Sequence, residues 1–329
     1  MLGKQIPIKI PPTESPKLIV VIDTEEEFDW SSEPMREANS VSAMSLVGRV
    51  QDIFDEYSII PCYVVDFPVA SKKEGHEILK EIYSSGRCEI GAHLHPWVNP
   101  PYDEELTKYN TFPGNLPIDL EREKLKKLRT AIYDAFGVET KIYKAGRYGV
   151  GEHTAEILEE AGFEIDLSIC PPVDFTSIGG PDFSDFLSEP YWFGNRRLLE
   201  IPVTGAFVGW AGPLSKPLYN LAYKFKKFRL PGLLSKSAAV DRLILSPEGF
   251  DTDDHKKITN FLYNKGVRTF TWSFHSPSVV PGCTPYVKND VDLQKFLDSF
   301  RKYFDFFFDE LNGEASTPTM LKCQLERTQ

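Results

Sequence analysis

The stretch CEIGAHLHPW, residues 88–97, joins the pattern of a buried strand to a pair of histidines. The chain has only six histidines, and two of them, His93 and His95, stand here with one residue between them. Side chains two positions apart on a β-strand point to the same face of the sheet. The two imidazoles therefore converge on one point, as a divalent metal ion requires of its ligands.

Similar apolar runs recur on both sides of this stretch and alternate with helical patterns. Residues 18–22, LIVVI, are continuously apolar, which is typical of a strand buried on both faces. Further strands are predicted at 59–65, 141–145, 163–167, 198–203, 243–245 and 267–274, and helices at 42–57, 72–84, 119–136, 151–161, 252–265 and 290–311. Seven or eight strands interleaved with helices indicate a parallel α/β architecture, either a barrel or an open sheet.

No linker or change of composition divides the 329 residues, so one domain with a large insertion is the simplest interpretation. Residues 1–16 are an N-terminal extension, and the domain covers 17–311. Irregular sequence near 170–240 marks the large insertion, and the inserted segment within the domain is about 204–240. Residues 312–329 have the Ser, Thr, Pro and Gly content of a flexible tail.

The composition excludes several classes of protein. The formal net charge of −11 argues against general nucleic-acid binding. The five cysteines are odd in number, scattered and without a C-x-x-C pair, so no disulfide framework is indicated. The N-terminal residues lack the apolar segment of a signal peptide, and no run approaches the ~20 apolar residues of a membrane span, so a cytoplasmic location is expected. Nothing in the sequence indicates an oligomeric state.

Polar residues follow the predicted strands where each strand ends. Asp23 and Glu25 follow the first strand, Arg147 and Asp166 lie at the ends of two later ones, and His275 ends the last. The carboxyl ends of parallel strands meet at one edge of a barrel or sheet, and active sites of such folds lie there. The sequence therefore predicts that these side chains share a site with the histidine pair.

Two histidines and one carboxylate form an open divalent site with positions left for water and substrate. Either Glu25 or Asp23 would complete the pair of His93 and His95. The remaining carboxylate would act as general base towards a water whose pKa the ion lowers. His275, away from the ion, would protonate the leaving group.

Two further residues complete this hypothesis, and each has a plainer interpretation. Arg147 could pair with the base and hold it ionised, or be a surface residue. Asp166 could orient His275 and raise its pKa, or cap a turn. Glu248, in Ser-Pro-Glu-Gly, follows a predicted strand and is interpreted as a turn carboxylate, with a contribution to the site as the alternative.

These motifs resemble those of the polysaccharide deacetylase superfamily, the carbohydrate esterase family 4 or NodB-homology group. Within it the chain is most similar to the lipopolysaccharide-biosynthesis subgroup called WalW. The resemblance covers roughly residues 17–310 and rests on VIDTEEEFDW at 21–30, EIGAHLHPWVNPP at 89–101, KAGRYG at 144–149, DLS at 166–168 and SFHSPS at 273–278. It implies a distorted (β/α)7-type barrel of parallel strands that removes acetyl groups from sugars with a bound metal ion.

The resemblance also implies a role for each residue. Asp23 matches the catalytic base, and Glu25 takes the place of the ligand carboxylate that the family often has at the position of Thr24. His93 matches the first metal histidine. The second normally lies four residues later, where this chain has Trp97, so His95 must substitute for it.

For the remaining positions, Arg147 matches the arginine that braces the base, and Asp166 matches the aspartate that tunes the catalytic histidine, His275. The implied ion is zinc, with cobalt, nickel or manganese as alternatives. The implied substrate is an N-acetylated sugar or a polysaccharide or lipopolysaccharide precursor. Two other functions stay open: a non-carbohydrate amidohydrolase of the same fold, and a degenerate, non-catalytic carbohydrate-binding domain.

Aromatic residues and one basic segment complete the predictions. Candidates for sugar stacking, with core packing as the alternative, are Trp97, Tyr148, Trp192 and Trp210. Residues 214–236 contain six basic residues and no acid, interleaved with apolar ones: Lys216, Lys224, Lys226, Lys227, Arg229 and Lys236. This segment is either a peripheral membrane contact or a solvated helix or mobile lid.

Overall fold

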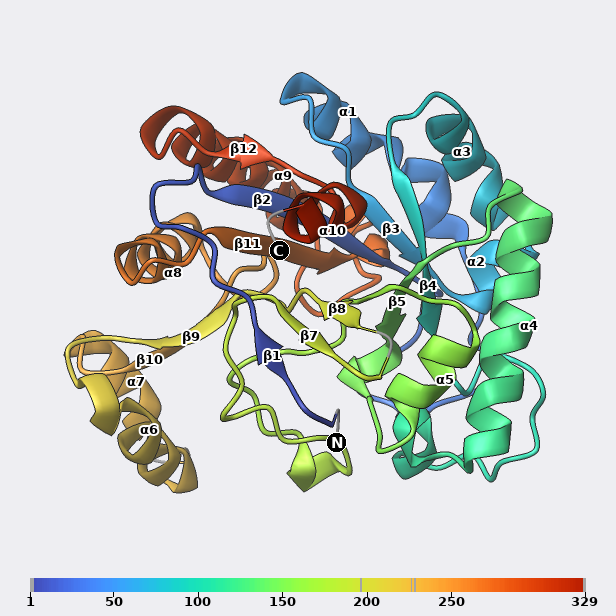
Figure 1. Ribbon diagram of the computed structural model, residues 1–329, viewed down its shortest axis with the longest axis horizontal. Coiled ribbons are helices and arrows are strands. Elements are labelled where there is room, and N and C mark those ends of the chain that lie inside the picture. The colour runs from blue at the N-terminus through green and yellow to red at the C-terminus, as the bar shows by residue number, and fades with distance from the viewer. Residues whose placement is uncertain (1–2, 196, 226, 228, 328–329) are drawn as a thin grey trace.

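A run of parallel strands forms the centre of the molecule (Figure 1). The computed structural model describes residues 3–195, 197–225, 227 and 229–327. In spatial order the parallel strands are β8 (Leu198–Glu200), β6 (Ile165–Asp166), β5 (Ile142–Ala145), β4 (Glu89–Leu94), β3 (Cys62–Val65), β2 (Lys17–Thr24) and β11 (Thr269–His275). The predicted α/β class with parallel strands is therefore confirmed.

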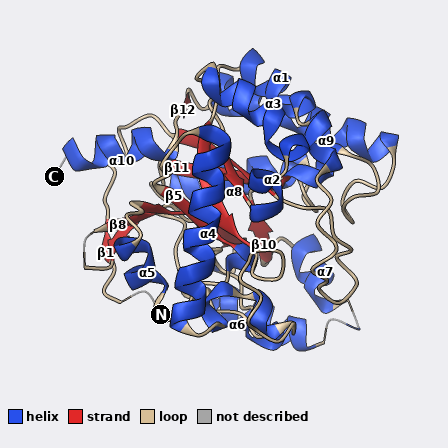
Figure 2. Cartoon of the chain, turned by 90° about the vertical axis from the view of Figure 1, so that its right-hand side faces the viewer, coloured by secondary structure: helices blue, strands red, loops and turns tan. Residues whose placement is uncertain are grey.

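Helices cover the outer face of this sheet, as Figure 2 shows from the side. They are α1 (Gly48–Glu56), α2 (Phe67–Ser71), α3 (Lys73–Ser84), α4 (Ile118–Phe136), α5 (Thr154–Glu160), α8 (Thr252–Asn264) and α9 (Asp290–Asp305). Helix α4 illustrates why they form: Leu125, Leu128 and Ile132 recur at helical spacing and are buried. It ends at Gly137, which takes the left-handed conformation (φ 70°) that a residue without Cβ adopts without strain.

The strands are buried on both faces, because alternate side chains enter two different cores. From β2, Leu18 and Val20 pack towards the helices, and Ile19 and Val21 pack towards the interior of the barrel. Apolar residues fill the part of the interior towards the amino ends of the strands. The next inward position after Val21 on β2 is Asp23, so polar groups occupy the carboxyl end. This alternation decides which strand residues can reach the site.

The barrel is distorted where its two edges meet. Strands β8 and β11 form no ladder, and single hydrogen bonds connect their edges instead. The amide of Leu245 donates to the carbonyl of Thr204 (2.8 Å), the amide of Thr271 donates to Thr204 Oγ1 (2.7 Å), and the amide of Ser273 donates to the carbonyl of Leu245 (3.4 Å). The chain around Thr204 and Leu245 thus completes the wall.

An insertion leaves the barrel between Thr204 and Leu245. It consists of an antiparallel pair, β9 (Gly205–Val208) and β10 (Asp241–Ile244), with α6 (Ser215–Lys224) and α7 (Leu230–Lys236) at its end. It projects at the lower left of Figure 1. The structure thus places a projecting hairpin inside the region near 170–240 where the sequence predicts an insertion.

Both ends of the chain pack on the barrel. Near the N-terminus, β1 (Ile6–Pro7) pairs antiparallel with β7 (Tyr191–Phe193), which pairs with β8. The stretch expected to be a flexible tail forms β12 (Glu314–Ala315) beside β2, and then α10 (Pro318–Arg327). Leu321 and Leu325, one helical turn apart, pack into the inner core. The polar residues around them made this helical pattern difficult to recognise in the sequence. Residues 328–329 lie outside the described residues.

Within the described ranges, no helix has the length and apolar character needed to cross a membrane.

Candidate active site and metal centre

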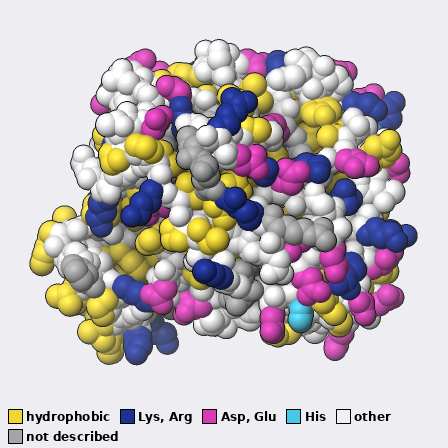
Figure 3. All heavy atoms as spheres, in the orientation of Figure 1, with side chains coloured by type: hydrophobic (Ala, Val, Ile, Leu, Met, Phe, Trp, Pro, Cys, Tyr) yellow, Lys and Arg dark blue, Asp and Glu magenta, His cyan; other side chains and the backbone are white. Residues whose placement is uncertain are grey.

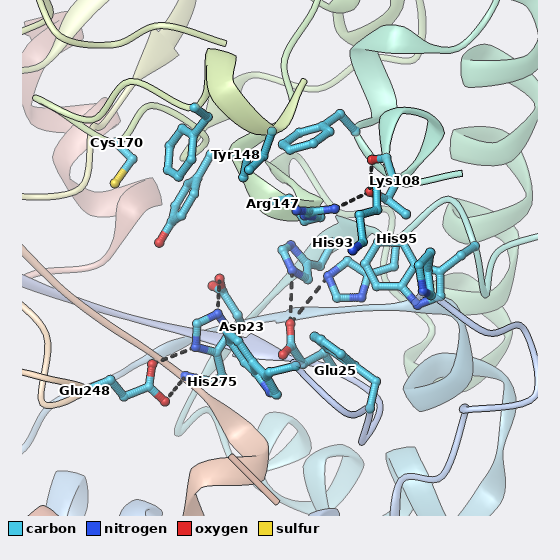
Figure 4. A pocket seen from close by; sticks show the side chains of 18 of the residues that line it. Asp23, Glu25, His93, His95, Lys108, Arg147, Tyr148, Cys170, Glu248 and His275 are labelled. Atoms are coloured by element: carbon cyan, nitrogen blue, oxygen red, sulfur yellow. Dashed lines mark hydrogen bonds and ion pairs between the residues drawn. The ribbon is translucent and has the colours of Figure 1, made fainter. Parts of the chain in front are cut away.

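A pocket of about 590 Å³ opens at the carboxyl ends of the strands (Figure 4). Strand pairing sets its geometry: Asp23 in β2 lies opposite His275 in β11, and His93 in β4 lies opposite Lys144 in β5. The lining includes most of the side chains predicted for the site, namely Asp23, Glu25, His93, His95, Trp97, Arg147, Tyr148 and His275, and also Glu248. The pocket thus lies at the edge where parallel barrels hold their sites.

Three of these side chains form a cluster that could hold a metal ion. Glu25 Oε2 lies 3.5 Å from His93 Nε2 and 3.4 Å from His95 Nε2. All three are buried, and their candidate ligand atoms lie within 4.8 Å of one another. The structure therefore groups Glu25, and not Asp23, with both histidines. Figure 4 shows both rings directed at the Glu25 carboxylate.

The hydrogen bonds of the two rings direct the same nitrogen into the cluster. His93 Nδ1 lies 3.0 Å from the carbonyl of Lys144, which can only accept, so Nδ1 carries the proton. His95 Nδ1 lies 2.9 Å from Glu26 Oε2, a carboxylate that fixes the same tautomer. Burial lowers the pKa of both histidines, that of His95 to about 4, so both are neutral near pH 7. Each Nε2 keeps its lone pair, as metal-ligating histidines do.

Glu25 itself is the strongest sign that a cation fits here. Its Oε1 atom is buried and has no hydrogen-bond partner. Burial raises the pKa of this carboxyl to about 7, against the opposing charges of His275 and His93. A buried carboxylate oxygen without a partner is unfavourable unless a cation or a proton compensates it. Two imidazoles and one carboxylate are a donor set that suits zinc.

A second layer of carboxyl groups holds the cluster in place. The amide of Glu26 donates to Asp66 Oδ2 (2.8 Å), and Asp66 Oδ1 accepts from the amide of Val69 at the start of α2. Burial raises the pKa of Asp66 well above its ordinary value, so the carboxyl groups of Asp66 and Glu26 can share a proton. Trp97 stacks on His95 at 4.2 Å. No role was predicted for Glu26 or Asp66, although the acidic run after Asp23 was a signal for Glu26.

Asp23 is held by a buried lysine. Lys144 Nζ donates to Asp23 Oδ1 (2.5 Å) and to Ser273 Oγ (3.0 Å). Burial alone would raise the pKa of Asp23, but the charges of Lys144, His93 and His275 outweigh it, and the pKa is lowered. Asp23 is therefore ionised at neutral pH. The sequence did not indicate Lys144, whose only signal was a lysine near the end of an apolar strand.

His275 faces Asp23 and is anchored from behind. Its Nε2 lies 3.8 Å from Asp23 Oδ2, and its Nδ1 donates to Glu248 Oε2 (2.6 Å). The His275 amide and Ser278 Oγ donate to the other oxygen of Glu248. Burial lowers the pKa of His275, but the charges of Glu248 and Glu25 outweigh it and raise the pKa to about 10. His275 is therefore a protonated acid at neutral pH.

Asp166 does not make the predicted contact with His275. Ile165 and Leu167 enter the inner core, so Asp166 between them points to the opposite face of β6. There it accepts from Ser168 and lies against Glu200, whose pKa burial raises well above its ordinary value. Glu248, interpreted from the sequence as a turn carboxylate, makes the contact with His275 instead. The position of Asp166 at a strand end was predicted correctly, but its side chain lies on the face away from the site.

Arg147 lines the pocket but does not pair with Asp23. Its Nη1 donates to Thr111 Oγ1, and its guanidinium lies 4.3 Å from the centre of the Phe112 ring. It follows β5 with a positive φ of 55°, which carries its side chain away from Asp23. Lys144, three residues earlier and pointing inward, takes the place beside Asp23 that was predicted for Arg147.

The four aromatic candidates divide into two pairs. Trp97 and Tyr148 line the pocket. Trp192 is buried in the inner core from β7, and Trp210 lies on the projecting insertion, so neither lines it. Trp30, which the sequence did not indicate, lies edge-on to His275 with ring centroids 4.8 Å apart, and it is partly exposed at the pocket.

Glu248→Gln is expected to lower the pKa of the His275 ring. Removing the Glu248 charge lowers this pKa from about 10, so the protonated form is lost at lower pH. An NMR titration of the His275 ring in both proteins measures the change. Glu77→Gln, an exposed acid on α3, is the control. A His275 pKa that does not change in Glu248→Gln would contradict this assignment.

The fold and the site together define a distorted parallel α/β barrel with a candidate metal centre beside a carboxylate and a protonated histidine. No protein-family model and no curated protein sequence matches the chain. A solved structure from Mycobacterium smegmatis, provisionally described as a polysaccharide deacetylase, is 15% identical with a TM-score of 0.55, over 99% of this chain and 94% of that one. This similarity shows a shared fold.

Two other structural neighbours have lower TM-scores. The peptidoglycan deacetylase PdaC from Bacillus subtilis is 10% identical with a TM-score of 0.43, over 97% of this chain and 95% of that one. A carbohydrate esterase family 4 pseudoenzyme from Bacillus anthracis is 11% identical with a TM-score of 0.43, over 95% of this chain and 68% of that one.

Proposed function

We propose that this protein is a metal-dependent hydrolase that removes an acetyl group from an N-acetylated sugar. The observation that carries the proposal is the cluster of Glu25, His93 and His95 in one pocket with Asp23 and His275. A metal-ligand set next to a base and an acid is the inventory that amide hydrolysis needs. The motif resemblance and the shared fold support the same reaction class.

The side chains divide the work of hydrolysis between them. A divalent ion held by Glu25, His93 and His95 would supply Lewis-acid activation of a water and of the acyl carbonyl. Asp23, which is ionised beside Lys144, accepts a proton from the water as the water oxygen bonds to the acyl carbon. His275 donates its Nε2 proton to the nitrogen as the carbon–nitrogen bond breaks. Acetate and the free amine leave.

The proposed metal is zinc, with cobalt, nickel or manganese as alternatives that the same donors accept. The proposed substrate is a polysaccharide or lipopolysaccharide precursor, in keeping with the resemblance to the WalW subgroup. The pocket volume of about 590 Å³ lies within the range of small-ligand sites. Tyr148 lines the pocket and Trp30 lies at its rim, and both offer aromatic faces or edges to a sugar ring, whereas Trp97 is 3% exposed and stacks on His95.

Metal removal is the first test. The purified protein should release acetate from N-acetylated amino sugars or their oligomers, lose this activity after chelation, and regain it with one equivalent of zinc. Metal content and acetate release are measured on the same samples. His93→Ala should fail to regain activity, and His153→Ala, an exposed histidine on the surface, should regain it fully.

The other outcomes separate the rival functions. Acetate release from non-carbohydrate amides alone would indicate an amidohydrolase of the same fold. Absence of bound metal, together with sugar binding that His93→Ala leaves unchanged, would indicate a non-catalytic binding domain. Either result would overturn the proposal.

A further inference from the structure

The insertion between the barrel edges is charged unlike the rest of the protein. We call residues 205–244 the hairpin lobe: β9, α6, α7 and β10. The chain carries a net charge of −11, yet Asp241 is the only acidic residue in the sequence of the lobe. Exposed basic side chains of the lobe are Lys224, Lys227, Arg229 and Lys236. Lys226 and Phe228 lie outside the described residues. The lobe is therefore a cationic projection on an acidic protein.

Helix α6 exposes a stripe of large apolar side chains along one face, while Leu218 and Tyr219 on its other face are half-buried. Its buried residues are small: Ser215 and Ala222. Leu214, Leu221 and Phe225 follow one another at spacings of seven and four residues, so they share a face, and all three are exposed. Leu214 is 63% exposed and Leu221 is 56% exposed. An amphipathic surface helix normally buries this stripe.

Further apolar side chains continue this surface beyond α6. Trp210, just before α6, is 73% exposed, and its ring is held in place because Nε1 donates to the carbonyl of Ser237 (3.0 Å). Leu233 on α7 is 59% exposed. Figure 3 shows hydrophobic side chains beside lysines and arginines at the lower left, where the lobe projects. Exposed apolar residues clustered in this way mark an interaction site.

We propose that the hairpin lobe docks on the surface of an anionic lipid bilayer. Lysine and arginine side chains would contact lipid phosphates, and Trp210, Leu214, Leu221 and Phe225 would enter the boundary between headgroups and acyl chains. The charge is complementary to such a surface, while the rest of the protein is acidic. The lobe is a projection on which apolar side chains alternate with cations. Such a surface fits a lipid bilayer, which can deform around it, better than a protein partner, whose surface must match its shape.

The lobe is connected directly to the pocket. Arg242 and Ile244 of β10 line the pocket, and their strand continues into the lobe through its pairing with β9. A membrane-docked lobe therefore holds the pocket close to the bilayer. This placement favours a substrate that is itself attached to a lipid. That last step rests on the proposed function, whereas the docking does not.

Vesicle co-sedimentation tests the docking with the full chain. At low salt the protein should bind vesicles of phosphatidylcholine with phosphatidylglycerol, and not vesicles of phosphatidylcholine alone. A lysine near an anionic surface contributes about a fivefold factor in affinity, so Lys224→Gln/Lys227→Gln should weaken binding about 25-fold. Raising the salt concentration should reduce binding as it screens these charges. Leu214→Gln/Leu221→Gln should weaken binding at every salt concentration.

Matched controls keep the test specific to the lobe. Leu187→Gln is an equally exposed leucine outside the lobe, and Lys73→Gln is an exposed lysine on α3; both should bind as the unaltered chain does. Acetate release from a water-soluble substrate should be the same in every lobe variant, which separates this inference from the proposed function. No binding to anionic vesicles, or unchanged binding by both lobe variants, would overturn the docking. If the protein does not bind vesicles but forms dimers, and Leu214→Gln/Leu221→Gln dissociates these dimers, then the exposed face binds a second copy of the chain instead.

Discussion

Asp23→Asn is expected to lower kcat by about 10³-fold and to leave the metal content unchanged. Asn keeps the shape of the side chain and an oxygen that can accept from Lys144, but it cannot take a proton from water. The change therefore removes the base and leaves Glu25, His93 and His95 in place. Steady-state acetate release and metal analysis of the same preparation measure the two effects.

Stability must be followed in this variant, because Lys144 loses its counter-charge. Leaving one member of a buried ion pair alone costs on the order of 3–5 kcal/mol, so a lower melting temperature is expected. Asp29→Asn is the control, since Asp29 is an exposed carboxylate at the same pocket. If Asp23→Asn remains folded and retains activity within tenfold of the unaltered protein, then Asp23 is not the base. If the metal is lost instead, then Asp23 is a ligand.

Glu25→Gln is expected to weaken metal binding by more than about a hundredfold, since loss of a second-layer partner alone can cost that much. Calorimetric titration with zinc measures the affinity, and the rise of melting temperature with zinc should disappear. Glu121→Gln is a closely matched control. Glu121 is also buried with its pKa raised by burial to about 7, but it accepts from Thr154, away from the pocket. Unchanged zinc affinity in Glu25→Gln would rule out the proposed ligand set.

The same variant changes how stability depends on pH when metal is absent. The folded-state pKa of Glu25, raised to about 7 by burial, exceeds the ordinary value of 4.5. The folded state therefore binds more protons between these values, and stability falls as pH rises from about 4.5 to 7. The loss is about 3 kcal/mol for this shift. Glu25→Gln should remove this fall, as bound zinc should in the unaltered protein, and chemical denaturation across pH measures it.

The architecture could be predicted because burial leaves a direct mark on parallel strands. A strand covered on both faces, such as Leu18–Ile22 of β2, must be apolar throughout, and helices between such strands keep their own period. That His93 and His95 meet a carboxylate at the end of β2 was also accessible, although the residues left open whether it is Asp23 or Glu25. This prediction depends on the two-residue period of one strand and on the common edge of parallel strands.

The partners of His275 and Asp23 could not be predicted in the same way. Glu248 reaches His275 from a turn, and nothing in Ser-Pro-Glu-Gly distinguishes it from an ordinary turn carboxylate. Lys144 is hidden in a strand, where a buried lysine is rare and its partner lies on a distant strand. Asp166 lies at the end of a parallel strand, as predicted, but on the face that points away from the site. Each of these contacts depends on tertiary geometry across the barrel.

The pairing of β2 with β11 has a consequence for how the site is completed during folding. Strands β2 to β5 follow one another in both the sequence and the sheet. His93 and Lys144 lie in β4 and β5, and Glu25 and His95 directly follow β2 and β4. His275 comes from β11, near the far end of the chain, and reaches Asp23 only when the barrel edges meet. Long-range parallel pairing forms slowly, and a nascent chain emerges N-terminal end first. The cluster of Glu25, His93 and His95 can therefore assemble before His275 arrives, so a metal ion bound there would not by itself report a finished barrel.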